Sequence, residues 1–88
     1  MEELKKRILE IDLLINQWFI ESKRIEVRPP EIEQYLISKG YYQPSQRPGR
    51  YLRADLRVLE SLNLLDIFVH VDIERLPNYW CFKRITVE

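Results

Sequence analysis

The sequence predicts one α+β domain over residues 1–88, made of three helices followed by a β-hairpin. Apolar residues recur at helical steps of three and four through most of the chain. From residue 65 they alternate at period two, as in a strand. A length of 88 residues suits one domain with one modest core, and a composition of 45% hydrophobic and 32% charged residues is that of a folded protein.

Residues 2–24 are predicted to form a long helix with two apolar stripes. The first stripe consists of Leu4, Ile8, Ile11, Ile15, Trp18 and Ile25. The second consists of Leu9, Leu13 and Ile20. A small domain needs one stripe per helix, so the second stripe either packs within a domain that wraps the helix on several sides or forms a homodimer interface. We expect the homodimer, because the helix is longer than a three-helix core can cover.

Two shorter elements and a long connection follow. The alternation over residues 25–28 indicates a short strand, and a Pro-Pro pair suits the first turn of a second helix over residues 30–39. Gly40 is placed to end that helix at its C′ position. Residues 40–49 are rich in turn-forming, polar and aromatic types, and Ser45 among them is a candidate cap for an early start of the third helix.

Residues 50–62 predict a third helix with two different faces. One face is apolar and consists of Leu52, Leu56, Leu59 and Leu62. The opposite face carries Arg50, Arg53 and Arg57. Asp55 projects into the leucine arc, where it either interacts with the helix dipole or pairs with an arginine of a neighbouring element. Asn63 is expected to end the helix, because asparagine tolerates the left-handed conformation.

The rest of the chain is predicted to form a β-hairpin. Residues 65–73 alternate as a strand, with one face made of Leu65, Ile67, Val69, Val71 and Ile73. His70 is expected on the other face, exposed to solvent beside Phe68. Residues 75–78 form the turn, for which Pro and Asn are suited, and residues 79–87 return as the partner strand.

The order helix, short strand, helix, helix, strand, strand resembles the winged helix-turn-helix family over nearly the whole chain. The third helix stops at a Leu-Asn-Leu-Leu run directly before the hairpin, as a recognition helix does before a wing. The connection over residues 40–49 is longer than the turn of a simple helix-turn-helix. The resemblance implies a small transcriptional regulator that binds double-stranded DNA. As a homodimer, it would place two recognition helices in successive major grooves of a pseudo-palindromic site.

The residues expected to contact DNA are Ser45, Gln46, Arg47, Arg50, Tyr51, Arg53, Arg57 and Arg75. Arginine pairs bidentately with guanine or with phosphate, and hydroxyl and amide groups donate to phosphates. Arg75, in the hairpin turn, is expected to reach the backbone or the minor groove. Although the formal net charge is zero, residues 43–58 hold four arginines against one aspartate, a surplus of three.

Two other interpretations stay open. The arginine face is a solvated helix side if Arg53 or Arg57 pairs with Glu60, since exposed ion pairs contribute little. Alternatively, the chain is a protein-interaction module or complex subunit that does not bind DNA, which its zero net charge and its exposed aromatic residues favour. These aromatic residues are Phe68, Tyr79 and Trp80. Added salt should weaken DNA binding steeply and an apolar interface much less.

The sequence does not support an enzyme, a cofactor, a metal site or a small-molecule ligand. It has one His and one Cys, so no pair of ligands has the spacing that zinc prefers, and its two isolated glycines form no phosphate loop. The lone Cys81 is expected to be a small core or edge residue.

The expected location is intracellular: cytoplasmic, and at the nucleoid if the chain binds DNA. A lone cysteine suits a reducing compartment, the N-terminus does not resemble a secretory signal, and no apolar run is long enough to span a membrane. The charge-rich, isoleucine-rich and glycine-poor composition favours a thermophile or one of its viruses as the source.

Overall fold

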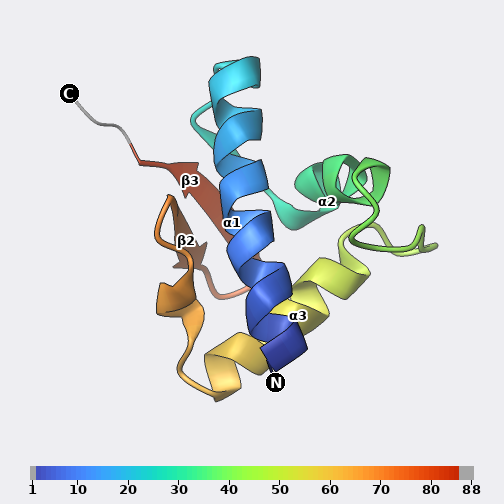
Figure 1. The fold of residues 1–88 in the computed structure, drawn as a ribbon, viewed down its shortest axis with the longest axis vertical. Coiled ribbons are helices and arrows are strands. Elements are labelled where there is room, and N and C mark those ends of the chain that lie inside the picture. The colour runs from blue at the N-terminus through green and yellow to red at the C-terminus, as the bar shows by residue number, and fades with distance from the viewer. Residues whose placement is uncertain (1, 86–88) are drawn as a thin grey trace.

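Three helices and a three-stranded antiparallel sheet make up residues 2–85, the part of the chain that the computed structural model describes (Figure 1). This arrangement confirms the predicted α+β class. The elements in chain order are α1 (Glu2–Ser22), β1 (Glu26–Val27), α2 (Pro29–Ser38), α3 (Arg50–Ser61), the 3-10 turn η1 (Leu65–Ile67), β2 (Val71–Arg75) and β3 (Trp80–Arg84).

Helix α1 contributes one side of the core through Ile8, Ile11, Ile15 and Phe19, all fully buried. The three isoleucines belong to the first predicted stripe, and Phe19 lies next to its member Trp18, which is only partly buried. The helix ends at Ser22, two residues earlier than predicted, because Lys23 takes a left-handed conformation with φ 61°. Ile25 therefore lies beyond the helix and is 67% exposed, so its predicted place in the core is wrong.

Strand β3 is the centre of the sheet, and it pairs antiparallel with β1 on one side and β2 on the other. Trp80 and Phe82 of β3 are buried, and the Phe82 ring meets Phe68 edge-on with the centroids 5.7 Å apart. Cys81 lies between them and is also buried, as predicted. The hairpin turn consists of Pro77 and Asn78. Residues 86–87 of the predicted strand lie outside the described residues.

The predicted strand over residues 65–73 is wrong in its first half. Residues 65–67 form η1, and β2 begins only at Val71. The predicted facing is wrong before β2, since Phe68 is 8% exposed and Val69 is 61% exposed, but it is right at Val71, which is buried, and at Asp72, which is exposed. The cause is Asp12, which lies on the buried side of α1. Its carboxylate accepts the backbone N–H groups of Val69 (3.3 Å) and His70 (3.0 Å), so these donors bind a helix instead of a strand.

His70 is exposed as predicted, and its ring Nδ1 lies 2.7 Å from Oδ2 of Asp12. Replacing Asp12 with Ala should lower the free energy of unfolding by about 2 kcal/mol, since two backbone donors lose their acceptor. Urea denaturation measures the loss. The control His70→Ala removes a side chain that is 47% exposed and should cost less than half as much. Equal losses would show that the backbone bonds to Asp12 contribute nothing.

The helix ends agree well with the sequence. Gly40 (φ 87°) and Asn63 (φ 59°) both have the left-handed conformation predicted for C′ positions. Leu52, Leu56 and Leu59 of α3 are fully buried, but the fourth predicted core leucine, Leu62, is 43% exposed because it caps the helix end.

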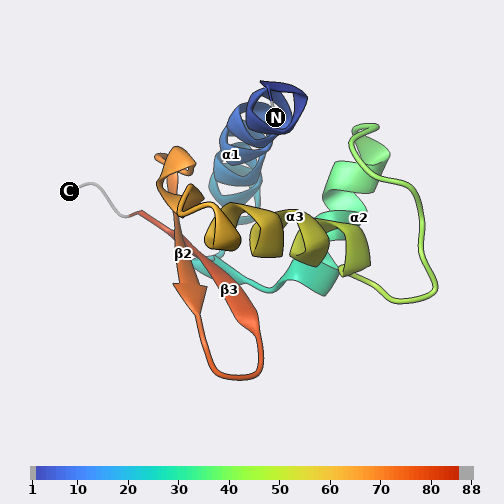
Figure 2. The ribbon, with the colours of Figure 1, turned by 90° about the horizontal axis from the view of Figure 1, so that it is seen from below.

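The elements are arranged on two sides of α3. Figure 2 shows α1 on one side of α3 and the tip of the β2–β3 hairpin extending on the other. Within residues 2–85, no helix is both long and apolar enough to cross a membrane.

Candidate nucleic-acid interface

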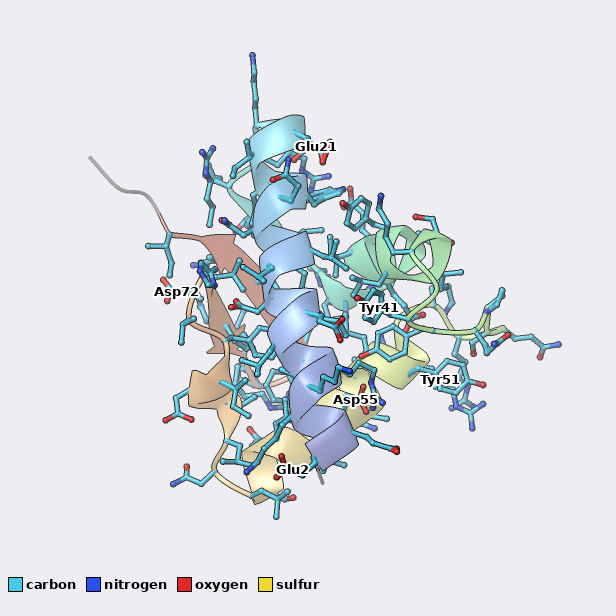
Figure 3. All side chains as sticks on the ribbon, viewed as in Figure 1. Glu2, Glu21, Tyr41, Tyr51, Asp55 and Asp72 are labelled. Atoms are coloured by element: carbon cyan, nitrogen blue, oxygen red, sulfur yellow. The ribbon has the colours of Figure 1, made fainter. Side chains whose placement is uncertain are left out.

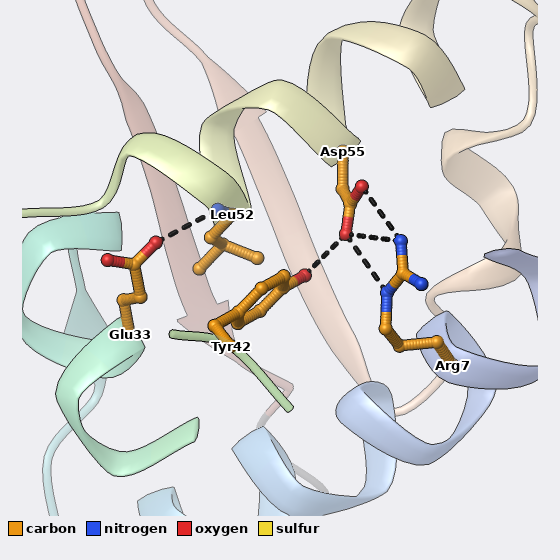
Figure 4. A network of polar contacts seen from close by, with 5 residues as sticks. All are labelled: Arg7, Glu33, Tyr42, Leu52 and Asp55. Atoms are coloured by element: carbon orange, nitrogen blue, oxygen red, sulfur yellow. Dashed lines mark hydrogen bonds and ion pairs between the residues drawn. The ribbon is translucent and has the colours of Figure 1, made fainter. Parts of the chain in front are cut away.

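A buried glutamate of α2 accepts hydrogen bonds from the backbone at the start of helix α3. Glu33 is fully buried, and its two carboxylate oxygens accept the backbone N–H groups of Gly49 (2.8 Å) and Leu52 (2.9 Å). Figure 4 shows Glu33 aimed at the first turn of α3. The helix therefore begins at Arg50 and not at Ser45, so the predicted early start and its Ser45 cap are wrong. A carboxylate here suits the first turn of a helix, which offers unpaired N–H donors.

The inner side of α3 is fixed to α1 by Asp55. Its carboxylate accepts N–H groups of Arg7, with Nη2 3.0 Å from Oδ1, and the hydroxyl of Tyr42, 2.6 Å from Oδ2 (Figure 4). Burial and, next, the bond to Asp55 raise the pKa of Tyr42 far above its ordinary value, so the hydroxyl stays a donor. Of the two predicted roles for Asp55, pairing with a neighbouring arginine is confirmed.

A hollow of about 310 Å³ lies beside this network. Figure 3 shows Tyr41, Tyr51 and Asp55 grouped next to the N-terminal half of α1, where they line it. The charges at this hollow, Arg7 and Asp55, pair with each other, so it presents little free charge to a ligand.

The other side of α3 carries a different hollow, of about 160 Å³, to which four arginines from three parts of the chain contribute. We call it the arginine hollow and define it by Arg28, Arg53, Arg57 and Arg75. Arg28 immediately precedes α2, Arg53 and Arg57 belong to α3, and Arg75 ends β2. The floor between them consists of Pro29, Pro30, Asn78, Tyr79 and Trp80.

Two of these guanidinium groups lie over aromatic rings. The Arg28 guanidinium is 4.1 Å from the Tyr79 ring centroid, and that of Arg75 is 4.5 Å from the Trp80 centroid. Arg75 also faces Glu60, with Nε 3.5 Å from Oε2. Planar stacking fixes the position of a guanidinium while its N–H groups stay free to donate.

In the described part of the chain, neither Arg53 nor Arg57 has such a neutralising partner. Within residues 2–85, no carboxylate lies at ion-pair distance from either side chain. Glu60, the partner that the solvated-face interpretation requires, pairs with Arg75 instead. The arginine hollow therefore combines four positive groups with one carboxylate, and such a site attracts an anion.

The sequence-predicted contacts separate into two groups. The structure brings Arg53, Arg57 and Arg75 together in the arginine hollow, with Arg75 in β2 and not in the turn as predicted. The others lie nearer the N-terminal end of α3, and they are Ser45, Gln46, Arg47, Arg50 and Tyr51. Figure 2 shows the loop before α3 extending away from the hairpin at that end.

Two local contacts hold this second group. The hydroxyl oxygen of Ser45 accepts the N–H of Arg47 (3.2 Å), and the Arg50 guanidinium lies 5.7 Å from the Tyr51 ring centroid. Sequence reasoning missed Arg28 and Glu33. A basic residue directly before a Pro-Pro helix start was the available signal for Arg28. Glu33, adjacent to the core residue Ile32, offered none, because an acid at that position is ordinarily solvated.

The three predicted dimer residues are exposed and lie on α1. Leu9, Leu13 and Ile20 are 51%, 54% and 48% exposed, so none belongs to the core of the chain. Within residues 2–85, no group of three His, Cys, Asp or Glu side chains is arranged to hold a metal ion.

Comparisons of the chain with protein-family models, with curated proteins and with solved structures found no match. The candidate site is therefore interpreted from its own geometry.

Proposed function

We propose that this chain binds double-stranded DNA as a small transcriptional regulator of the winged helix-turn-helix type. In this proposal α3 is the recognition helix, the β2–β3 hairpin is the wing, and the arginine hollow between them faces the DNA. The convergence of Arg28, Arg53, Arg57 and Arg75 carries the proposal. A helix fits the major groove, and a row of guanidinium groups suits phosphates and guanine edges.

The burial of two aromatic residues weakens the protein-interaction alternative. Of the aromatic residues that favoured it, Trp80 is 2% exposed and Phe68 is 8% exposed, so both belong to the core. Tyr79 is 38% exposed, and the Arg28 guanidinium lies over its ring. The surface beside the hairpin is thus cationic where that alternative requires it to be apolar.

The test compares the double variant R53A/R57A with a control that removes two positive charges elsewhere, R24A/K39A. Fluorescence anisotropy with duplex DNA at several salt concentrations gives affinity and its salt slope. R53A/R57A should weaken binding at least tenfold, and each lost phosphate contact should reduce the slope by about 0.9. The control should bind almost as the wild type does, since Arg24 pairs with Glu31 and Lys39 is remote from the hollow.

Single variants separate the two kinds of contact. An arginine that reads a base should cost about 1–3 kcal/mol of binding and relax the preference at that base, whereas a phosphate contact weakens all sequences alike. Circular dichroism serves as the folding control. If the triple variant R53A/R57A/R75A is folded and binds duplex DNA as tightly as the wild type, the proposal is wrong and the protein-interaction alternative leads.

A further inference from the structure

The outward face of α1 carries an apolar stripe that the core does not use. Leu9, Leu13 and Ile20 are each about half exposed, whereas the core residues Ile8 and Ile15 of the same helix are fully buried. At 100° per residue, the stripe lies roughly 130° around the helix from the centre of the buried face. It therefore points away from α3 and the sheet.

Beside this stripe lie two charged residues, Lys6 and Glu21, that can pair with each other when two copies of α1 are antiparallel. Along one flank the exposed residues are Lys6, Glu10, Gln17 and Glu21. Two such helices in antiparallel orientation, with the two-fold axis near Leu13, place Lys6 opposite Glu21 of the second copy. They also place Glu10 opposite Gln17. A parallel pair would instead place this flank of one helix against the other flank of its partner, so Lys6 and Glu21 would not meet.

We propose that a second copy of this chain covers the stripe, with the two α1 helices antiparallel. Leu13 packs near its own copy at the two-fold axis, while Leu9 and Ile20 fill the two halves of the contact. Figure 3 shows Glu2 and Glu21 at opposite ends of α1, so the contact can run along the whole helix.

This arrangement has a consequence for DNA that rests on the proposed function. In Figure 2 the hairpin tip and α1 lie on opposite sides of α3. A two-fold axis through the stripe then places the two arginine hollows on opposite sides of the dimer, facing away from each other. The dimer would link two DNA segments, whereas the sequence-based expectation has it bind one pseudo-palindromic site.

Sedimentation equilibrium at micromolar protein tests the dimer. The wild type should give twice the chain mass of 10.8 kDa. L9E/L13E should be a folded monomer, because neither leucine is in the core. The control Ile25→Glu places one such negative charge at an exposed residue beyond α1 and should remain a dimer. A monomeric wild type, or an L9E/L13E variant that dimerises as well as the wild type, overturns the proposal.

Cysteine cross-linking tests the orientation. Leu13→Cys should form an intersubunit disulfide on mild oxidation. Ile20→Cys should not, because antiparallel helices place the two copies of residue 20 roughly 20 Å apart. Efficient cross-linking through Ile20→Cys would indicate parallel helices and overturn the proposal. Charge reversal gives a second readout: K6E and E21K should each weaken the dimer, and the double variant K6E/E21K should restore it.

A bridging assay tests the consequence for DNA. Immobilised duplex is mixed with protein and with a second, labelled duplex. The wild type should retain the label, and L9E/L13E should bind each duplex without retaining it. A dimer that binds duplex but retains no label overturns the linking geometry. If no form binds duplex, the proposed function fails, while sedimentation and cross-linking still decide the dimer.

Discussion

Replacing Glu33 with Ala is expected to lower the free energy of unfolding by about 3 kcal/mol. The change leaves the buried N–H groups of Gly49 and Leu52 without an acceptor, and each such group costs about 1–3 kcal/mol. A domain of this size has a stability of roughly 5–15 kcal/mol, so the loss is a large fraction. In thermal unfolding, the midpoint should fall by about 15 °C.

The variant Glu33→Gln is the matched control. Its carbonyl oxygen can still accept one of the two N–H groups, so it should lose less stability than Glu33→Ala. If both variants unfold at the wild-type temperature, Glu33 does not hold the start of α3. Because α3 carries Arg53 and Arg57, the proposed DNA binding should also be weaker in Glu33→Ala at temperatures where the domain is still folded.

Replacing Gly49 with Ala is expected to cost about 3 kcal/mol of stability for a different reason. Gly49 has φ 87°, a conformation that costs an L-residue roughly 1–2 kcal/mol. A Cβ atom there would also lie 2.9 Å from the backbone nitrogen of Pro30 and 3.2 Å from the carbonyl carbon of Pro29. Backbone atoms cannot give way as a flexible side chain can, so α2 and α3 must separate.

Gly40 provides a control with the same backbone conformation. It also has φ 87°, but an added Cβ would meet no atom within 4 Å. Gly40→Ala should therefore cost only the conformational strain, about 1 kcal/mol. Chemical denaturation of both variants isolates the effect of the contact, and equal losses would contradict it. The Gly49 Cβ would also press on Nη1 of Arg53, 2.7 Å away, so Gly49→Ala should disturb the arginine hollow as well.

The local pattern of the sequence predicted the elements with a repeating signal. The α3 leucines at helical spacing, the C′ positions at Gly40 and Asn63, and the order of helices and strands agree with the structure. These features depend on residues within a few positions of one another. Side-chain periodicity and allowed backbone angles therefore suffice to predict them.

Two errors in the prediction have a common cause. Residues 65–69 alternate like a strand, yet Asp12 binds the backbone at Val69 and His70, 57 and 58 residues away in the chain. Ser45 was a reasonable cap by residue type, yet Glu33 caps α3 from another helix. In each case a buried carboxylate satisfies backbone donors that would otherwise pair locally, and no periodicity in the sequence marks such a residue.

For the candidate site, too, local sequence pattern and tertiary structure determined different features. The sequence by itself determined that α3 has a leucine face and an arginine face, because both recur at the spacing of one helix. Only the tertiary structure decided which arginines belong together. It joined Arg28 and Arg75 to Arg53 and Arg57, and it left Arg47 and Arg50 outside the hollow. The physical reason is that the hollow lies between three elements, whose packing depends on the buried contacts of Glu33, Asp12 and the core.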